Sequence, residues 1–404
     1  MDFMAAASVA QLQKYFDGIG QILGSDERRA SFATYAMGIF SDAERKSAEP
    51  LAARANIDPK RVDAEHQRLL HFLGNAVWSD HAVRQHAAKF ALNNMLAREP
   101  LEAWIFDDTG FLKQGKHSVG VKRQYTGSAG KIANCQIGVS LVIATSTEHL
   151  PVDFELYLPS DWTEDAARRK EAKIPDDIVF KTKPELALQM LKRAVDAGIP
   201  KAPVLADAAY GTSHEFREQL RALDFDFAVA VNSTTKVQLL GPNGKPGQRE
   251  SLVKLAQRLE KKKAFNRITW RQGSRRALTA RFVRRQVRVS ETETVTLLIE
   301  WRDDEPTPSN YFFISVPDIK ATKSLVRLVM QRWRIERTYE DLKGELGLDH
   351  YEGRGFPGWH HHVSVVLCCY AFIIAERTRL FFSSTRGARQ TSANSLPPRA
   401  PLPP

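Results

Sequence analysis

The 404-residue sequence predicts an α/β protein with a helical domain in front of it and a β-rich insertion within it. Three observations predict this class. Residues 1 to about 95 carry apolar side chains at helical spacing, the middle of the chain alternates between β-like runs and helices, and a later stretch consists of β-like runs. Hydrophobic residues make up 43% and charged residues 26% of the chain, which is the balance of a globular protein. This length predicts two or three structural units.

Residues 1–97 are predicted to form a helical domain. Apolar residues recur at spacings of three and four, which places them on one face of a helix: Val9, Leu12, Phe16, Ile19 and Leu23. Ser41 and Glu44 predict a capping box that opens a second helix toward Arg54. A third helix is expected after the turn at Asp58-Pro59. A DNA-binding unit of the helix-turn-helix type and a purely structural bundle both fit this pattern.

Residues 98–231 and 318–382 are predicted to form the core. Strands are predicted at 103–106, 135–144, 152–156, 203–206 and 225–231, and helices at 184–197 and 214–223. Three strands followed by alternating helices and strands is the order of an RNase H-like fold. A doubly wound Rossmann-type sheet is the alternative, but no glycine-rich phosphate loop directly follows the first strand.

Residues 232–317 are predicted to form a β-rich, basic insertion domain made of strands alone. Its strands are expected at 265–270, 278–289, 294–301 and 311–316. A long helix at 323–346 and an apolar helix from Val363 then return to the core. Residues 383–404 are polar and rich in proline, so they are predicted to be a disordered tail.

The positive charge of the chain is concentrated in this insertion. The net charge is +11, and residues 261–288 alone contain eleven Lys or Arg and no Asp or Glu. Such a block predicts a polyanionic partner, because no acid within it can neutralise it. A solvated surface is the alternative. The candidate DNA contacts are Lys261, Lys262, Lys263, Arg275, Arg276, Arg284 and Arg285.

Composition excludes several other classes of protein. Three cysteines, Cys135, Cys368 and Cys369, offer neither a disulfide framework nor zinc-ligand spacing, which indicates reduced thiols in a cytoplasmic protein. No secretory signal opens the sequence, and its most apolar late segment, 363–375, is shorter than the ~20 residues that span a bilayer. Metal binding by His360–His362 is disfavoured, because consecutive residues point in different directions. We therefore expect a cytoplasmic location and no membrane association.

Acidic residues follow two of the predicted core strands. Asp107 and Asp108 end the first strand and Asp207 ends the fourth, and functional groups of α/β sheets gather at the carboxyl ends of strands. In the RNase H-like order these two strands are neighbours, so we expect their acids to converge. Either Asp107 or Asp108 satisfies this argument.

A third acid is expected from the helix predicted at 323–346. Arg332, Glu336 and Lys343 are spaced by four and seven residues, which places them on one helical face. Glu336 would then bind a cation while the two basic side chains hold phosphate oxygens. An Arg–Glu surface pair is the alternative. Clustered carboxylates without cysteine suit Mg²⁺ or Mn²⁺, and two such ions ~3.5–4 Å apart support in-line phosphoryl transfer.

These residues resemble the DDE transposases of bacterial insertion sequences, in the branch with a Tyr-x2-Arg-x3-Glu-x6-Lys signature. Arg332, Glu336 and Lys343 match the signature, whereas Val329 stands at its Tyr position. The first acid of this branch precedes Thr, which selects Asp108, and the second matches Asp207 in LADAAYG. The stretches 107–138 and 348–362 resemble one subgroup of the branch, and the resemblance covers roughly residues 25–380.

The resemblance implies an RNase H-like core with a β-rich insertion before the third acid. It implies that Asp108, Asp207 and Glu336 bind two Mg²⁺ or Mn²⁺ ions, while Arg332 and Lys343 contact phosphates. The implied activity is cleavage of double-stranded DNA at the element ends and strand transfer into target DNA. The implied partners are these DNAs and a second copy of the chain in a synaptic complex, within the bacterial cytoplasm at the nucleoid.

Two further questions follow from the resemblance. In relatives that form a hairpin intermediate, an aromatic residue of the insertion stacks on a flipped base, and Trp270 or Trp301 could take this role. A plain tryptophan of a β-sheet core is the alternative for each. A DNA-binding remnant or repressor without catalytic activity is the alternative function, motivated by Val329 and the proline-rich tail, and a structure-specific nuclease of the same fold is a third.

Overall fold

The computed structural model describes residues 2–56, 58–273, 277–317 and 319–391. Its N-terminal part is helical, with α1 (Asp2–Leu23), α2 (Asp26–Phe40), α3 (Ala48–Ala55), α4 (Pro59–Gly74) and α5 (Asp80–Leu96). The side chains of Ser25, Asp58 and Ser79 accept hydrogen bonds from the first turns of α2, α4 and α5. The capping box predicted at Ser41 is wrong, because Ser41 ends α2 and the next helix begins at Ala48.

A mixed sheet forms the core of the protein. Its first strands are β1 (Ala103–Leu112), β2 (Lys122–Thr126), β3 (Lys131–Ala144), β4 (His149–Tyr157), β5 (Val204–Ala206) and β6 (Phe227–Ala230). β1 and β4 run antiparallel to β3, whereas β5 is parallel to β1 and to β6. The order β4-β3-β1-β5-β6 is the RNase H-like order. The predicted fold class is therefore confirmed.

Helices cover both faces of this sheet. They are α8 (Lys183–Asp196), α9 (Ala208–Gly211), α10 (His214–Ala222), α12 (Thr322–Val329) and α13 (Trp333–Gly344), whereas the short helices α6 (Ser160–Thr163) and α7 (Ala166–Ala172) follow β4 in the chain. Alternate residues of β1 point to opposite faces. Trp104 and Phe106 pack into the core beneath α8 and α10, whereas Ala103 and Ile105 pack with α12 and α13. The single helix predicted at 323–346 is interrupted by a 3₁₀ turn, η1 (Met330–Arg332).

The insertion continues the core sheet. It contains β7 (Lys236–Leu240), β8 (Pro246–Ser251), α11 (Leu252–Lys261), β9 (Asn266–Gln272), β10 (Ala277–Arg288), β11 (Thr294–Trp301) and β12 (Asn310–Ile314). β12 pairs with β6, and the sheet runs on through β11, β10, β7 and β8, with β9 on β10. The prediction of strands alone was wrong, because α11 buries Leu252, Leu255 and Leu259. The buried ion pair of Arg217 with Glu293 ties α10 to this part of the chain.

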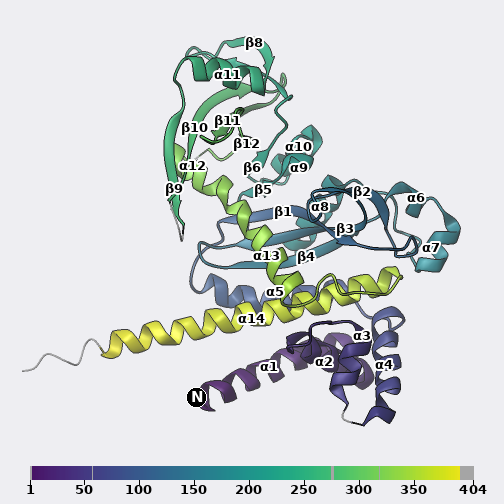
Figure 1. The fold of residues 1–404 in the computed structure, drawn as a ribbon. Helices are drawn as coiled ribbons and strands as arrows, with labels where there is room; N and C mark the ends of the chain where they lie inside the picture. Colours follow the sequence, from purple (N-terminus) through teal and green to yellow (C-terminus); the bar gives the residue numbers. More distant parts are fainter. Residues whose placement is uncertain (1, 57, 274–276, 318, 392–404) are drawn as a thin grey trace, which may run out of the picture.

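The last helix, α14 (Phe356–Thr391), joins the N-terminal helices to the sheet. It lies below the sheet in Figure 1 and packs on α5, β4, α2 and α4. It begins seven residues before the predicted Val363, and residues 383–391 are helical, so the predicted disorder is wrong for that stretch. The rest of the predicted tail, 392–404, lies outside the described residues. Within the described chain, no helix has the length and apolar character to cross a membrane.

The three consecutive histidines of α14 are structural. His361 stacks on Trp78 with ring centres 3.8 Å apart, and its Nδ1 lies 2.7 Å from the Leu73 carbonyl oxygen. Burial lowers the pKa of His362 to about 4, so this ring is neutral at pH 7. Each of the three histidines contacts the N-terminal helices or the core, so α14 packs against both and connects them.

Candidate active site

Asp107 and Asp207 leave the parallel part of the sheet side by side. β1 and β5 pair as far as Phe106 and Ala206, and the residue that follows each of these two is an aspartate. The prediction that the first strand ends at Asp108 was wrong, because β1 continues to Leu112 against β3. The pairing of β1 with β5 ends at Phe106, so the edge of β1 beside Asp107 is open.

Asp207 forms the N-cap of the short helix α9. Its Oδ1 accepts a hydrogen bond of 2.9 Å from the N–H of Ala209, which fixes the carboxylate at the carboxyl edge of β5. The negative charge of Asp207 raises the pKa of both Asp107 and Asp108. The acids of the two strands therefore lie close enough to repel one another, as the sequence led us to expect.

The neighbours Asp107 and Asp108 have different partners. The Oδ2 atom of Asp107 lies 2.9 Å from an Nη atom of Arg332, at the start of α13. The Oδ2 atom of Asp108 lies 2.9 Å from Nζ of Lys183, at the start of α8. Neighbouring residues of a strand point to opposite faces, so each acid meets the cation of the helix on its own side.

Burial raises the pKa of both carboxyl groups. For Asp107 the value reaches about 6, with Arg332 acting against the rise and Asp207 and Asp108 adding to it. For Asp108 burial is again the main cause, and Lys183 acts against it. Closely spaced, partly desolvated carboxylates are an environment that a divalent cation relieves.

The turn η1 and helix α13 carry the predicted third acid, Glu336, and the two predicted phosphate contacts, Arg332 and Lys343. Lys343 donates hydrogen bonds to Oγ1 of Thr109 at 2.9 Å and to the carbonyl oxygen of Gly110 at 2.8 Å. Arg332 reaches Asp107, so both basic side chains meet β1. Glu336 lies between them in the helix, is exposed, and its charge raises the pKa of Arg332. The structure thus places Arg332 and Lys343 against β1, whereas the described contacts of Glu336 do not include either strand-end aspartate.

Two buried polar side chains lie beside these acids. Burial, followed by the charges of Asp108 and Asp107, raises the pKa of Tyr210 well above its ordinary value, and a hydrogen bond from the Tyr210 hydroxyl lowers the pKa of Asp108. Nε of Arg332 is buried and has no hydrogen-bond partner among the described residues. A buried donor without a partner is costly unless a ligand satisfies it, so this atom indicates a place for a further oxygen acceptor.

Sequence reasoning missed two side chains of this site. Tyr210 lies three residues after Asp207 in the same motif, so its place in LADAAYG was the available signal. Lys183 had no comparable signal, because it comes from a helix that only the tertiary fold brings to Asp108.

The donor set fits a hard divalent cation. Asp108, Asp207 and Glu336 offer carboxylate oxygens, which Mg²⁺ and Mn²⁺ prefer as ligands.

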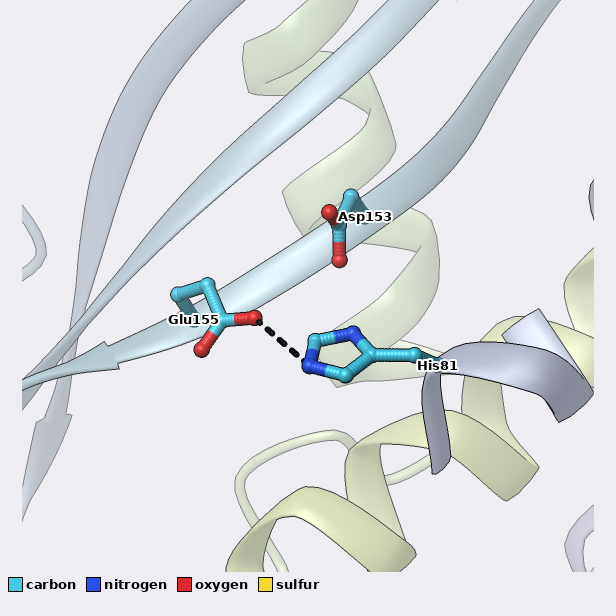
Figure 2. A group of neighbouring side chains, drawn as sticks. All are labelled: His81, Asp153 and Glu155. Carbon is cyan, nitrogen blue, oxygen red and sulfur yellow. Dashed lines mark ion pairs between the residues drawn. The ribbon is translucent and has the colours of Figure 1, made fainter. Parts of the chain in front are cut away.

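Among the described residues, one group of three side chains has the spacing of metal ligands, and it lies outside the predicted site. Figure 2 shows His81 of α5 facing Asp153 and Glu155 of β4. Arg193 lies 2.8 Å from Asp153 and 2.7 Å from Glu155, and Arg84 lies 3.1 Å from Asp153. Two guanidinium groups thus neutralise both carboxylates, and we assign this cluster to the packing of α5 on β4.

The basic block of the insertion does not form one surface. Lys261, Lys262 and Lys263 are exposed at the end of α11. On one face of β10, Arg284 donates hydrogen bonds to the carbonyl oxygens of Ile319 and Lys320. The side chain of the neighbouring Arg285 points to the other face, because alternate residues of a strand point in opposite directions. Arg275 and Arg276 lie outside the described residues.

The two candidate tryptophans differ in accessibility. Trp301 is only 8% exposed, donates to the carbonyl oxygen of Glu305 at 3.0 Å and packs against Phe265. It is a core residue, which was the alternative reading. Trp270 is half-buried and packs its ring edge-on to Phe282. Trp270 also lines a groove, so it alone of the pair is available to a ligand.

This groove lies between β9–β10 and α12–α13 and has a volume of about 1530 Å³. It is lined by Trp270, Arg271, Arg327 and Trp333, among others. The guanidinium of Arg271 lies 4.2 Å from the ring centre of Trp333, which is 36% exposed. Within the described ranges, no carboxylate pairs with Arg271 or Arg327, so their charges remain available to an anion. Sequence reasoning did not single out Trp333.

Comparison with known proteins gives two matches. Residues 19–277 match a family described as DDE superfamily endonuclease. The chain is also 26% identical, over 384 residues, to a protein named as the probable transposase for insertion sequence element IS701 of Microchaete diplosiphon. That similarity covers 93% of this chain and 90% of the relative.

Proposed function

Because the chain belongs to the DDE superfamily of endonucleases, we propose that it is an insertion-sequence transposase that cuts element ends and joins them to target DNA. The observation that supports this proposal is the meeting of Asp107, Asp108 and Asp207 where the pairing of β1 with β5 ends, with Arg332 bonded to Asp107. Acids at this edge, with phosphate-binding cations beside them, are what phosphoryl transfer requires.

Asp108, Asp207 and Glu336 are the proposed ligands of two Mg²⁺ or Mn²⁺ ions. The chemistry that these ions supply when bound is activation of a water or a 3′-hydroxyl and stabilisation of the leaving oxygen. The carboxylates hold their oxygens in place through the N-cap of α9 and the strand pairing of β1. Asp107 stays outside this ligand set and positions Arg332.

Arg332 and Lys343 are the proposed phosphate contacts. An Nη atom of Arg332 holds Asp107, and its buried Nε has no described partner, so a phosphate oxygen that enters the site beside Asp107 would satisfy this donor. Lys343 is fixed by Thr109 and Gly110 and lies over the ring of Phe111, which orients its ammonium toward β1. Both cations orient the scissile phosphate beside the acids.

The groove beside α12 and α13 is the proposed path of double-stranded DNA. Arg271 and Arg327 supply backbone contacts, and Lys261, Lys262 and Lys263 extend the positive surface at the end of α11. Trp270 is the proposed stacking residue, since base–aromatic stacking contributes ~1–3 kcal/mol. Cutting and joining two element ends implies a homodimeric synaptic complex.

The test is cleavage of linear DNA that carries the terminal repeats of the element, with Mg²⁺. We expect wild type to cut and Asp207→Ala to lose on the order of a thousandfold in rate, because a ligand carboxylate is gone. Glu340→Ala is the matched control, since Glu340 is exposed on α13 and pairs with Arg337. Equal cleavage by Asp207→Ala and wild type would sink the assignment, and cutting without joining would indicate a nuclease.

A DNA-binding protein without cleavage activity is the second candidate function. Val329 favours it, because the residue at the signature's Tyr position is 2% exposed and supplies no hydroxyl to the site. This candidate predicts binding to the terminal repeats in EDTA and no strand cleavage with any divalent ion.

A further inference from the structure

Lys183 makes an unexpected contact with a proposed metal ligand. Its Nζ lies 2.9 Å from Oδ2 of Asp108. The side chains are 25% and 16% exposed, so water screens this pair only in part. Asp108 is thus not a free carboxylate in the protein without metal.

The start of α8 holds Lys183 in position. Thr182 and Glu185 form a complete capping box around it, and Pro184 stiffens the first turn. The ammonium also lies 5.9 Å from the ring centre of Tyr157. The face of this ring can bind the ammonium by a cation–π interaction when the ammonium leaves Asp108.

We infer that the ammonium of Lys183 takes the cation position at Asp108 in the metal-free protein and that a divalent ion must displace it. The inference rests on the proposed function, because it assumes that Asp108 is a metal ligand. Lys183 then lowers the affinity for metal while it keeps the metal-free site ordered.

The charge arrangement supports this competition. A metal ligated by Asp108 would lie beside the oxygen that Lys183 already holds, and a positive ammonium at hydrogen-bond distance repels a divalent ion. Arg332 neutralises Asp107 in the same way on the other face. Without these cations, Asp107, Asp108 and Asp207 would repel one another, because Asp107 and Asp207 directly follow the paired residues Phe106 and Ala206.

The experiment is titration of the full chain with Mn²⁺ in the absence of DNA, followed by calorimetry and by the signal of free Mn²⁺ in electron paramagnetic resonance. Lys183→Met should bind Mn²⁺ with a Kd lower by about tenfold. Lys183→Arg keeps the charge and should not tighten binding. Lys192→Met is the matched control, because Lys192 is exposed on the same helix. An unchanged or higher Kd for Lys183→Met would overturn the inference.

A second measurement uses the wild-type protein, so it does not depend on the folding of a variant. Reductive methylation of lysines, read by mass spectrometry, should label Lys183 faster with Mn²⁺ than without it, while Lys192 stays constant. Equal labelling of Lys183 in both conditions contradicts displacement. If wild type does not bind Mn²⁺ at all, the proposed metal site fails as well, whereas Mn²⁺ binding that is insensitive to Lys183 removes this inference alone.

Discussion

At the scale of single residues, the site depends on two neighbouring aspartates with different surroundings. Asp107 pairs with Arg332 and Asp108 pairs with Lys183, each at 2.9 Å. Arg332 belongs to the proposed phosphate-binding stripe, so its partner Asp107 is engaged in positioning. Lys183 is the proposed displaceable counter-ion of Asp108. Asp108 is therefore the aspartate that exchanges an ammonium for a metal ion.

Exchanging each aspartate for asparagine separates these roles. Asp108→Asn should lose on the order of a thousandfold in the rate of DNA cleavage, because a neutral amide is a poor ligand for a divalent ion. Asp107→Asn should lose about tenfold, because the amide oxygen still accepts a hydrogen bond from Arg332. The measurement is single-turnover cleavage with saturating Mg²⁺. The reverse order of the two losses would assign the metal to Asp107.

The pKa of Asp107 predicts a pH dependence of stability. Burial raises this pKa to about 6 in the folded protein, against 3.8 for the free side chain, so the folded state binds more protons between these values. Relative to Asp107→Asn, wild type should therefore lose stability as pH rises from ~4 to ~6, by up to about 3 kcal/mol. Urea unfolding in EDTA measures the difference, and a difference that does not vary with pH would contradict it.

At the scale of elements, the position of the helix that carries Glu336 depends on an interruption of the helix predicted at 323–346. η1 interrupts the predicted helix, and α13 then starts at Trp333 with Arg332 directed to β1. Met330, Gln331 and Trp333 face the groove. One short segment thus presents Arg332 to the acids and its neighbours to the proposed DNA path.

The contact of α5 with β4 and α14 depends on a buried charge. Arg84 is 2% exposed, and its guanidinium bonds to Asp80 at 2.7 Å, Asp153 at 3.1 Å and Ser364 at 2.8 Å. Removing one partner of such a network leaves carboxylates without compensation in the interior. The network therefore holds the N-terminal helices and α14 against the sheet.

Arg84→Met should lower the free energy of unfolding by ~3–5 kcal/mol, because buried Asp153 then lacks one of its two cations. Arg68→Met is the control, since Arg68 forms an i,i+3 pair with Glu65 and is 42% exposed, and it should cost at most ~1 kcal/mol. Denaturant unfolding measures both. Equal losses would mean that the buried network contributes no more than a surface pair.

At the scale of the whole molecule, one continuous sheet joins the catalytic core to the insertion. β12 pairs with β6, next to β5 and its Asp207, so a ligand on the insertion is held in a defined position relative to the acids. Figure 1 shows α13 lying across the sheet from the insertion to α14. DNA bound in the groove beside α12 and α13 would therefore lie close to the helix that carries Glu336.

DNA affinity should depend steeply on salt. If about six phosphates are contacted, a plot of log affinity against log salt should have a slope near −5. The double variant Arg271→Ala/Arg327→Ala should reduce this slope by about 2, because two phosphate contacts are lost. Arg168→Ala on α7 is the control, since Arg168 pairs with Asp161 and Asp165 away from the groove. An unchanged slope in the double variant would exclude the groove as the path of DNA.

The sequence by itself determined the fold class and named most of the proposed site. The succession of strands and helices along the chain follows from local periodicity, and Asp207, Arg332, Glu336 and Lys343 stand in motifs with regular spacing, because helix and strand periods are properties of the local chain. The continuous run of strands also predicted the insertion, although not α11 within it.

Only the tertiary structure decided how these residues are paired. Lys183, Tyr210 and Trp333 reach the site or the groove from elements whose mutual positions depend on long-range packing. The choice of partner for Asp107 and Asp108 follows from which helix covers each face of β1. The basic block, which reads as one stretch in the sequence, is divided between faces of the sheet, because alternate residues of a strand point in opposite directions.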